Sequence, residues 1–165
     1  DLIRSTLLVG FFGETEEAFN ELLDFQREAE LDWLGVFPYS PEEGTPALKP
    51  DPETGATPEP DVSPRVAERR AAIVNERQRE ITARRMERFV GRDLDVLVEE
   101  LVPEEPLAIG RMYAQAPEVD GSVVINVPQE GPWVDRPGRT PIEPGALVRC
   151  RIVAAHGLDV EAVPL

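Results

Sequence analysis

Residues 2–15 have the sequence LIRSTLLVGFFGET, and this stretch decides how the chain begins to fold. Its first part is β-prone and almost continuously apolar toward its end, a pattern typical of a strand buried in a parallel sheet. Gly10 and Gly13 then mark a turn, and Thr15 is suited to cap a helix because its hydroxyl can accept an N–H group of the first turn. The stretch predicts a strand, a turn and the start of a helix.

The next residues extend this pattern to a βαβ unit. Mostly apolar residues recur at helical spacing after Thr15, namely Phe19, Leu22, Leu23, Gln26 and Ala29. Residues 34–39, LGVFPY, predict a second short strand. Two parallel strands do not form a stable sheet by themselves. We therefore expect this segment to be part of a larger α/β domain.

A proline-rich segment separates this unit from a long helix. Residues 46–64 combine many prolines with Asp, Glu, Gly and Thr, which predicts a solvated loop. Residues 65–89 contain neither proline nor glycine, and Ser63 and Gly91 are suited to begin and end a helix there. Its arginines interleave with apolar residues, so the helix either docks on an acidic surface or exposes a solvated arginine row.

The remaining residues predict a small β domain. Five short β-prone runs are separated by glycines, prolines and acidic residues; they are residues 94–98, 108–113, 122–127, 147–154 and 158–163. This spacing, with no helix between the runs, is typical of a small closed or nearly closed antiparallel barrel of the OB type. We place the domain boundaries at residues 1–62, 63–91 and 92–165.

Charge is unevenly distributed over these three segments. Residues 1–62 hold 15 acidic and 3 basic residues, net −12, and residues 63–91 hold 4 and 8, net +4. Residues 92–165 hold 13 acidic and 6 basic residues, net −7. Binding to RNA draws its affinity from Lys and Arg against phosphate, so an acidic terminal domain favours a basic protein partner over RNA. The alternative is an acidic surface that only provides solubility.

The sequence has almost no features that would indicate a disulfide, a metal site or a membrane segment. The single cysteine, Cys150, excludes an internal disulfide, and with one histidine, His156, the chain can hardly build a metal site. No run of eighteen apolar residues and no secretory signal occurs. We expect a cytoplasmic protein, a monomer without a membrane partner, and any metal to be held outside this chain.

The order of several motifs resembles the radical S-adenosylmethionine methylthiotransferase family. These motifs are VGFFGET at residues 9–15, YSPEEGT at 39–45, FVG at 89–91, GR at 110–111 and APEVDG at 116–121. The family has a proline where this chain has Phe12. The resemblance implies the C-terminal βαβ part of a radical S-adenosylmethionine barrel, a connecting helix, and a terminal five-stranded TRAM β-barrel that binds substrate.

The resemblance also implies a chemistry. In this family a reduced iron-sulfur cluster cleaves S-adenosylmethionine to a radical, which abstracts hydrogen from the target carbon before sulfur and a methyl group are installed. The similar branch modifies an aspartate of small-subunit ribosomal protein number twelve. The cysteines that hold the two 4Fe-4S clusters are absent here, so we expect them outside this chain and expect the chain alone to be inactive.

Site residues follow from the resemblance position by position. It implies S-adenosylmethionine contacts at Arg4, Gly10, Gly13 and Glu14. It also places Glu42 and Glu43 near the barrel mouth. The acidic charge of the terminal domain separately suggests an anionic face for a basic protein substrate, formed by Asp93, Asp95, Glu99, Glu100, Glu118 and Asp120. Simple turn glycines, helix-start electrostatics and solvated carboxylates are the alternatives. Tyr113 and Trp133 are either aromatic anchors or ordinary packed side chains.

Two other functions stay open. The branch that modifies transfer RNA carries Arg-Pro at the place of Glu42 and Glu43 together with a basic terminal domain, and this chain is acidic at both. A non-catalytic acidic binding module with an OB-like barrel is the second alternative. The expected βαβ segment, which needs further strands, argues against such a free-standing module.

Overall fold

The computed structural model describes residues 2–165, which form two compact units. One unit ends at Ile81, and the other consists of Thr82–Leu165. The boundary lies inside the long helix α2 (Pro64–Met86), which contributes to both units. We describe each unit by itself.

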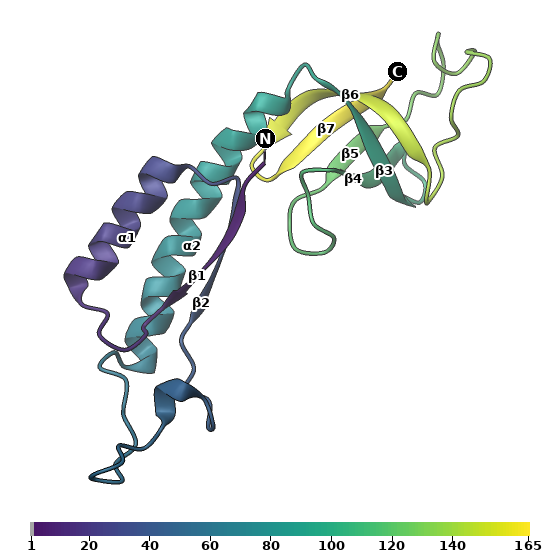
Figure 1. Ribbon diagram of the computed structural model, residues 1–165. Coiled ribbons are helices and arrows are strands. Elements are labelled where there is room, and N and C mark those ends of the chain that lie inside the picture. Colours follow the sequence, from purple (N-terminus) through teal and green to yellow (C-terminus); the bar gives the residue numbers. More distant parts are fainter. Residues whose placement is uncertain (1) are drawn as a thin grey trace. The chain divides into compact units, whose positions relative to one another are not determined.

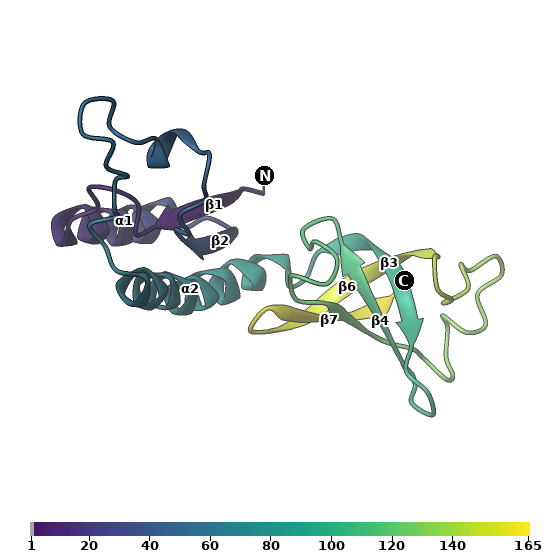
Figure 2. The ribbon, with the colours of Figure 1, turned by 90° about the horizontal axis from the view of Figure 1, so that it is seen from below.

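The first unit contains the predicted βαβ segment. Strand β1 (Arg4–Val9), helix α1 (Glu16–Ala29) and strand β2 (Trp33–Pro38) follow one another, and β1 and β2 pair in parallel. The predicted cap is confirmed, because the Thr15 hydroxyl oxygen accepts the N–H of Ala18 at 3.1 Å. Both helices run alongside the strand pair (Figures 1 and 2).

The core of this unit draws on both helices. Its buried side chains are Val9, Phe19, Leu34, Val36, Ala71 and Val74. Gln26 of α1 is also buried, and its Nε2 donates to the carbonyl oxygen of Val74 at 2.9 Å and to Oε1 of Gln78 at 3.2 Å. The helix that the sequence predicts as a connection therefore also forms part of the core over the β1–β2 pair.

The proline-rich segment and the end of α2 agree with the sequence. Between residues 46 and 63 the chain forms a single 3-10 turn, η1 (Pro46–Leu48), and otherwise lacks regular structure. Helix α2 begins at Pro64 and continues as a 3-10 turn, η2 (Glu87–Phe89). Gly91 follows with φ +83°, and its N–H donates to the carbonyl oxygen of Ile152 at 2.8 Å.

The second unit is a closed five-stranded barrel, as predicted. Its strands are β3 (Asp93–Leu101), β4 (Leu107–Met112), β5 (Val123–Asn126), β6 (Leu147–His156) and β7 (Asp159–Pro164). They close in the order β3-β4-β5-β7-β6. The strands curve around one another to close the barrel (Figure 1). The buried core of the barrel includes Val98, Met112, Ile125, Cys150, Ile152 and Val160.

One expectation about the barrel is wrong. The sequence predicts antiparallel pairing throughout, but β5 and β7 pair in parallel. The long connection formed by residues 127–146 carries the chain from β5 to β6, and the hairpin at Gly157 then returns it as β7 between β5 and β6. A connection of this length allows parallel pairing, which a short hairpin does not.

Candidate functional site

The turn between β1 and α1 joins three of the predicted cofactor residues. Gly10 and Gly13 have φ angles of +82° and +76°, a conformation that favours glycine. The N–H of Gly10 donates to Oε2 of Glu14 at 2.8 Å, and the N–H of Gly13 donates to Oδ2 of Asp61 at 3.0 Å. A Cβ atom at Gly10 would overlap the Cβ of Ala67 in α2, whereas nothing lies within 4 Å of such an atom at Gly13.

Glu14 connects this turn to α2 through a mostly buried ion pair. Its Oε1 lies 2.5 Å from Nη1 of Arg70, and the exposed fractions of the two side chains are 13% and 4%. Nη2 of Arg70 binds Oε1 of Glu16 at 2.6 Å. Burial by itself would lower the pKa of the Arg70 guanidinium, but hydrogen bonds to Glu16 and Glu14 raise it above its ordinary value. Arg70 therefore stays charged and fastens α2 to the start of α1.

Arg4 lies apart from the other three residues. It stands at the opposite end of β1, which at the ordinary rise of a strand is about 20 Å from Gly10. Its guanidinium lies over the ring of Trp33, 5.5 Å from the centroid. The structure thus brings Gly10, Gly13 and Glu14 together and leaves Arg4 separate.

An aromatic cluster lies next to this turn. The rings of Phe11, Phe12 and Tyr39 meet edge to face, with centroids 4.9 to 5.7 Å apart. The Tyr39 hydroxyl is buried without a hydrogen-bond partner among the described residues. Beside it is a cavity of about 220 Å³ lined by Tyr39, Pro41, Glu59, Pro60, Val62, Ser63 and Pro64. The sequence signal for this cluster is Phe12, where the family has proline.

Glu42 and Glu43 lie in the exposed loop after β2 and do not line this cavity. The loop is held by Thr45, whose hydroxyl donates to the carbonyl oxygen of Glu42 at 2.8 Å. The carboxylates of Glu42 and Glu43 are exposed at the surface, at the end of the strand pair where β2 ends.

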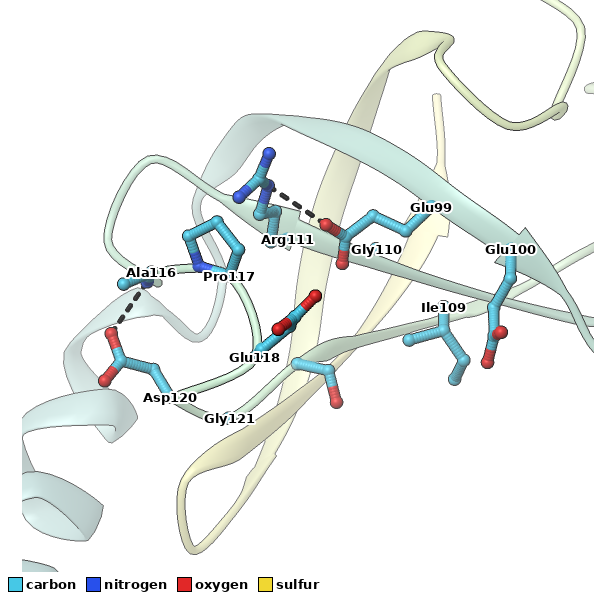
Figure 3. Close-up of a pocket in the computed structure, with 11 residues that line it drawn as sticks. Glu99, Glu100, Ile109, Gly110, Arg111, Ala116, Pro117, Glu118, Asp120 and Gly121 are labelled. Atoms are coloured by element: carbon cyan, nitrogen blue, oxygen red, sulfur yellow. Dashed lines mark hydrogen bonds and ion pairs between the residues drawn. The ribbon is translucent and has the colours of Figure 1, made fainter.

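The barrel carries an acidic hollow of about 480 Å³ (Figure 3). Its lining residues include Glu99, Glu100, Arg111, Glu118 and Asp120. Nε of Arg111 binds Oε1 of Glu99 at 3.2 Å, and Oδ2 of Asp120 accepts the N–H of Ala116 at 2.7 Å. Figure 3 shows the Glu118 carboxylate pointing into the hollow and the Asp120 carboxylate turned toward Ala116. In the described part of the chain, Glu100 and Glu118 have no ion-pair partner.

Asp93 and Asp95 do not line this hollow. Across the β3–β6 pairing, Asp93 binds Arg151 through two hydrogen bonds of 2.7 and 2.9 Å, and Asp95 binds Arg149 at 3.2 Å. The hydrogen bonds from Arg151 hold the pKa of Asp93 below its ordinary value. Of the barrel carboxylates predicted to contact substrate, the structure places Glu99, Glu100, Glu118 and Asp120 around the hollow, and it places Asp93 and Asp95 outside it, in ion pairs.

A more apolar groove of about 430 Å³ adjoins the hollow and shares Arg111 with it. The other lining residues are Asp95, Leu97, Met112, Tyr113, Gln115 and Leu147. Sequence reasoning singled out Tyr113 but missed Gln115, Leu97 and Leu147, because nothing in the local pattern separates a groove residue from an ordinary surface residue. Trp133 lines neither hollow nor groove, and the guanidinium of Arg139 covers its ring at 4.5 Å.

The remaining singled-out residues are Cys150 and His156. Cys150 is fully buried in the barrel. Its burial, and to a smaller extent the negative charge of nearby Asp95, raise the pKa of the Cys150 thiol to about 12. Nε2 of His156 lies 2.9 Å from Oε1 of Glu161. Among residues 2–165, no cluster of three or more His, Cys, Asp or Glu is arranged to hold a metal ion. No helix described in that range is long and apolar enough to cross a membrane.

Comparisons with known proteins agree with the resemblance. Residues 90–165 match the family model of the TRAM domain. The chain is 43% identical over 164 residues to the ribosomal protein uS12 methylthiotransferase RimO of Treponema denticola, covering 98% of this chain and 33% of that protein. It is 46% identical over 166 residues to the protein of the same name from Shewanella amazonensis, covering 99% and 31%. The chain spans about a third of the length of these curated relatives. Residues 90–165 therefore form a TRAM domain, and the whole chain is homologous to the C-terminal part of the ribosomal protein uS12 methylthiotransferases.

Proposed function

We propose that this chain is the C-terminal part of a radical S-adenosylmethionine enzyme that methylthiolates an aspartate of ribosomal protein uS12 in the cytoplasm. In this proposal the TRAM barrel binds the protein substrate. The observation that carries it is the acidic hollow, in which the carboxylates of Glu100 and Glu118 have no ion-pair partner among the described residues. The names of the curated relatives supply the identity of the substrate.

Electrostatics favours a basic protein over RNA. Ribosomal proteins are generally basic because they lie against RNA phosphate, and a barrel segment of net −7 attracts them. The same field repels the phosphates of RNA. Asp93 and Asp95 contribute less than Glu100 and Glu118 because arginines already neutralise them. Glu42 and Glu43 provide a second exposed acidic contact on the first unit.

The residues of the β1–α1 turn fit a cofactor contact only in part. S-adenosylmethionine, together with reduced 4Fe-4S clusters held elsewhere, would supply the radical chemistry. The N–H of Gly10 and the carboxylate of Glu14 already have partners within the chain, so they position the turn against α2. The N–H of Gly13 also has a partner, Asp61, but a Cβ atom at Gly13 would meet open space, so a ligand can approach the backbone more closely there than at Gly10. Arg4 has no part in this proposal.

One observation favours a transfer RNA substrate instead. The Tyr113 side chain is exposed beside Arg111 in the groove, and an exposed aromatic ring next to an arginine can stack on a nucleic-acid base. The acidic surroundings argue against this alternative. The experiment below includes transfer RNA for this reason.

The test is calorimetric titration of the 165-residue chain with purified ribosomal protein uS12 and, separately, with transfer RNA, at low and at physiological salt. We expect the double variant Glu100→Gln/Glu118→Gln to raise the Kd for the ribosomal protein about tenfold at low salt and less at physiological salt, where screening is stronger. The control variant Glu104→Gln/Glu105→Gln changes the net charge equally at exposed positions that line neither the hollow nor the groove, and we expect a smaller effect.

Tighter binding of transfer RNA than of the ribosomal protein would disprove the substrate assignment. An unchanged Kd in the Glu100→Gln/Glu118→Gln variant would disprove the role of the hollow. Circular dichroism of each variant checks that the barrel stays folded.

A further inference from the structure

Resting on the proposed function, we propose that the groove lined by Leu97, Met112, Tyr113 and Leu147 binds an apolar side chain of an extended segment of the same basic protein. In this proposal Gln115 donates a hydrogen bond from its Nε2 to a backbone carbonyl of that segment. The acidic hollow next to the groove then takes a neighbouring Lys or Arg. The terminal domain would thus recognise an apolar residue near a basic one, in addition to overall charge.

The strand register builds the apolar wall of the groove. Leu97 of β3 pairs with Arg111 of β4 on one side and with Leu147 of β6 on the other. Side chains that are directly opposite in neighbouring strands point to the same face, so these three stand together on the outside of the barrel. Leu147 and Tyr113 are 60% and 65% exposed. Large apolar side chains gathered at an exposed groove mark a binding surface.

Gln115 supplies a polar group that lacks a partner. Its side chain is 6% exposed and lines the groove, and its Oε1 accepts the N–H of Met112 at 3.2 Å, which fixes the orientation of the amide. Its Nε2 has no hydrogen-bond partner among the described residues. A buried donor without a partner is costly, and native structures rarely leave one unexplained. The atom has almost no accessible surface in the free chain, so a carbonyl oxygen of a bound peptide would satisfy it once the exposed groove side chains have moved aside.

The charges around the groove favour a basic peptide. Asp95 lines the groove but is paired with Arg149, and Arg111, which separates groove from hollow, is neutralised by Glu99, so neither adds a free charge. On the far side of Arg111, Glu100 and Glu118 are unpaired in the described part of the chain. A nucleic-acid backbone placed over these carboxylates would be repelled, whereas an extended peptide can present an apolar and a basic side chain to adjacent sites.

The test uses two groove variants of the 165-residue chain and one matched control. Leu147→Asn removes apolar contact without adding charge. Gln115→Glu keeps the acceptor for Met112 and removes the donor, and its added negative charge would by itself favour a basic protein, so weaker binding reports the lost donor. Val153→Asn is the control, because Val153 is also exposed on β6, at 42%, but does not line the groove. The Kd for purified ribosomal protein uS12 is measured by calorimetry at physiological and at high salt, and transfer RNA is titrated in parallel.

We expect each groove variant to raise the Kd about fivefold to tenfold at both salt concentrations, because apolar contacts and a buried hydrogen bond are screened far less than surface charge. The Val153→Asn variant should match the unaltered chain. The loss at high salt separates these variants from the carboxylate variants of the hollow, whose effect declines as salt rises.

Three results would overturn the inference, and they are distinguishable. If the unaltered chain binds the ribosomal protein but both groove variants behave like Val153→Asn, the groove proposal fails and the proposed function stands. If the unaltered chain does not bind the ribosomal protein, both fail. If the groove variants weaken binding of transfer RNA and not of the protein, the groove is a nucleic-acid platform. Since Leu147 is exposed, its replacement remains informative even where Gln115→Glu disturbs the turn.

Discussion

Gly10 and Gly13 have nearly the same backbone φ angle but different neighbours. Both need the left-handed conformation that glycine adopts without strain. A side chain at Gly10 would overlap the Cβ of Ala67, while a side chain at Gly13 would meet open space. The first glycine is therefore required by helix packing as well as by the turn.

This difference gives a prediction with an internal control. Gly13→Ala should lower the free energy of unfolding by about 1 kcal/mol, the cost of a left-handed alanine. Gly10→Ala carries the same cost and must also displace α2, so we expect a loss of about 3 kcal/mol. Urea unfolding of the two variants followed by circular dichroism measures the difference. Equal losses would show that Ala67 does not press on this position.

Sequence reasoning could identify the glycine pair as a turn but not this division of roles. The turn follows from residues close together in the chain, whereas the contact with Ala67 exists only after α2 has packed on the strand pair. The cofactor contacts of Arg4, Gly10, Gly13 and Glu14 stay predictions. For Gln115 no local pattern signals a buried amide, because its burial depends on how the barrel strands pair.

At the scale of elements, the structure shows whether the arginines of α2 pack against the protein or remain in solvent, which the sequence left open. An arginine row on a helix either docks or remains solvated, and the periodicity is the same in both cases. In the structure Arg70 is buried against Glu14 and Glu16, and Nη2 of Arg77 donates to the carbonyl oxygen of Leu23 at 3.2 Å. These arginines dock on the start and middle of α1.

Removing the buried arginine should weaken the first unit strongly. Arg70→Ala would leave the largely buried carboxylate of Glu14 without its cation, so we expect the free energy of unfolding to fall by about 3–5 kcal/mol. Arg69→Ala, at the exposed neighbouring position, should change it by less than about 0.5 kcal/mol. Urea unfolding measured side by side is the check. Similar values for the two variants would contradict the buried ion pair.

The strands of the barrel were predictable for a physical reason. The β-prone runs are bounded by glycines, prolines and acidic residues, and in β6 the buried and exposed residues of Val148–Ile152 also alternate visibly in the sequence. Which strands become neighbours is not a local property. The parallel β5–β7 pairing joins segments separated by the long 127–146 connection, and the sequence pattern therefore did not predict it.

On the scale of the whole molecule, the two units have separate cores and different sheets. The barrel is closed, so every strand has two neighbours. The β1–β2 pair stands alone within the described residues, with no third strand at either edge. A two-stranded sheet is marginal by itself and depends on the helices packed against it.

We therefore expect amide hydrogen exchange to be faster in β1 and β2 than in β5 and β6 of this chain. Ile125→Ala, in the barrel core, should cost about 2–5 kcal/mol and reduce protection in the barrel alone. Val74→Ala should reduce protection of β1 and β2 alone. Exchange measured by mass spectrometry on peptides from both units tests this. If either variant reduced the protection of amide hydrogens in both units, the two units would unfold together.

The position of β7 between β5 and β6 has a consequence for biosynthesis. Because β7 supplies both pairings that complete the barrel, β3, β4 and β5 cannot be enclosed until residues 159–164 have left the ribosome. At ordinary translation rates the segment from β3 to β7 takes roughly 4–14 s to synthesise. During that interval the apolar inner faces of the early strands are uncovered, so nascent chains of this length should depend on chaperones until the last strand arrives.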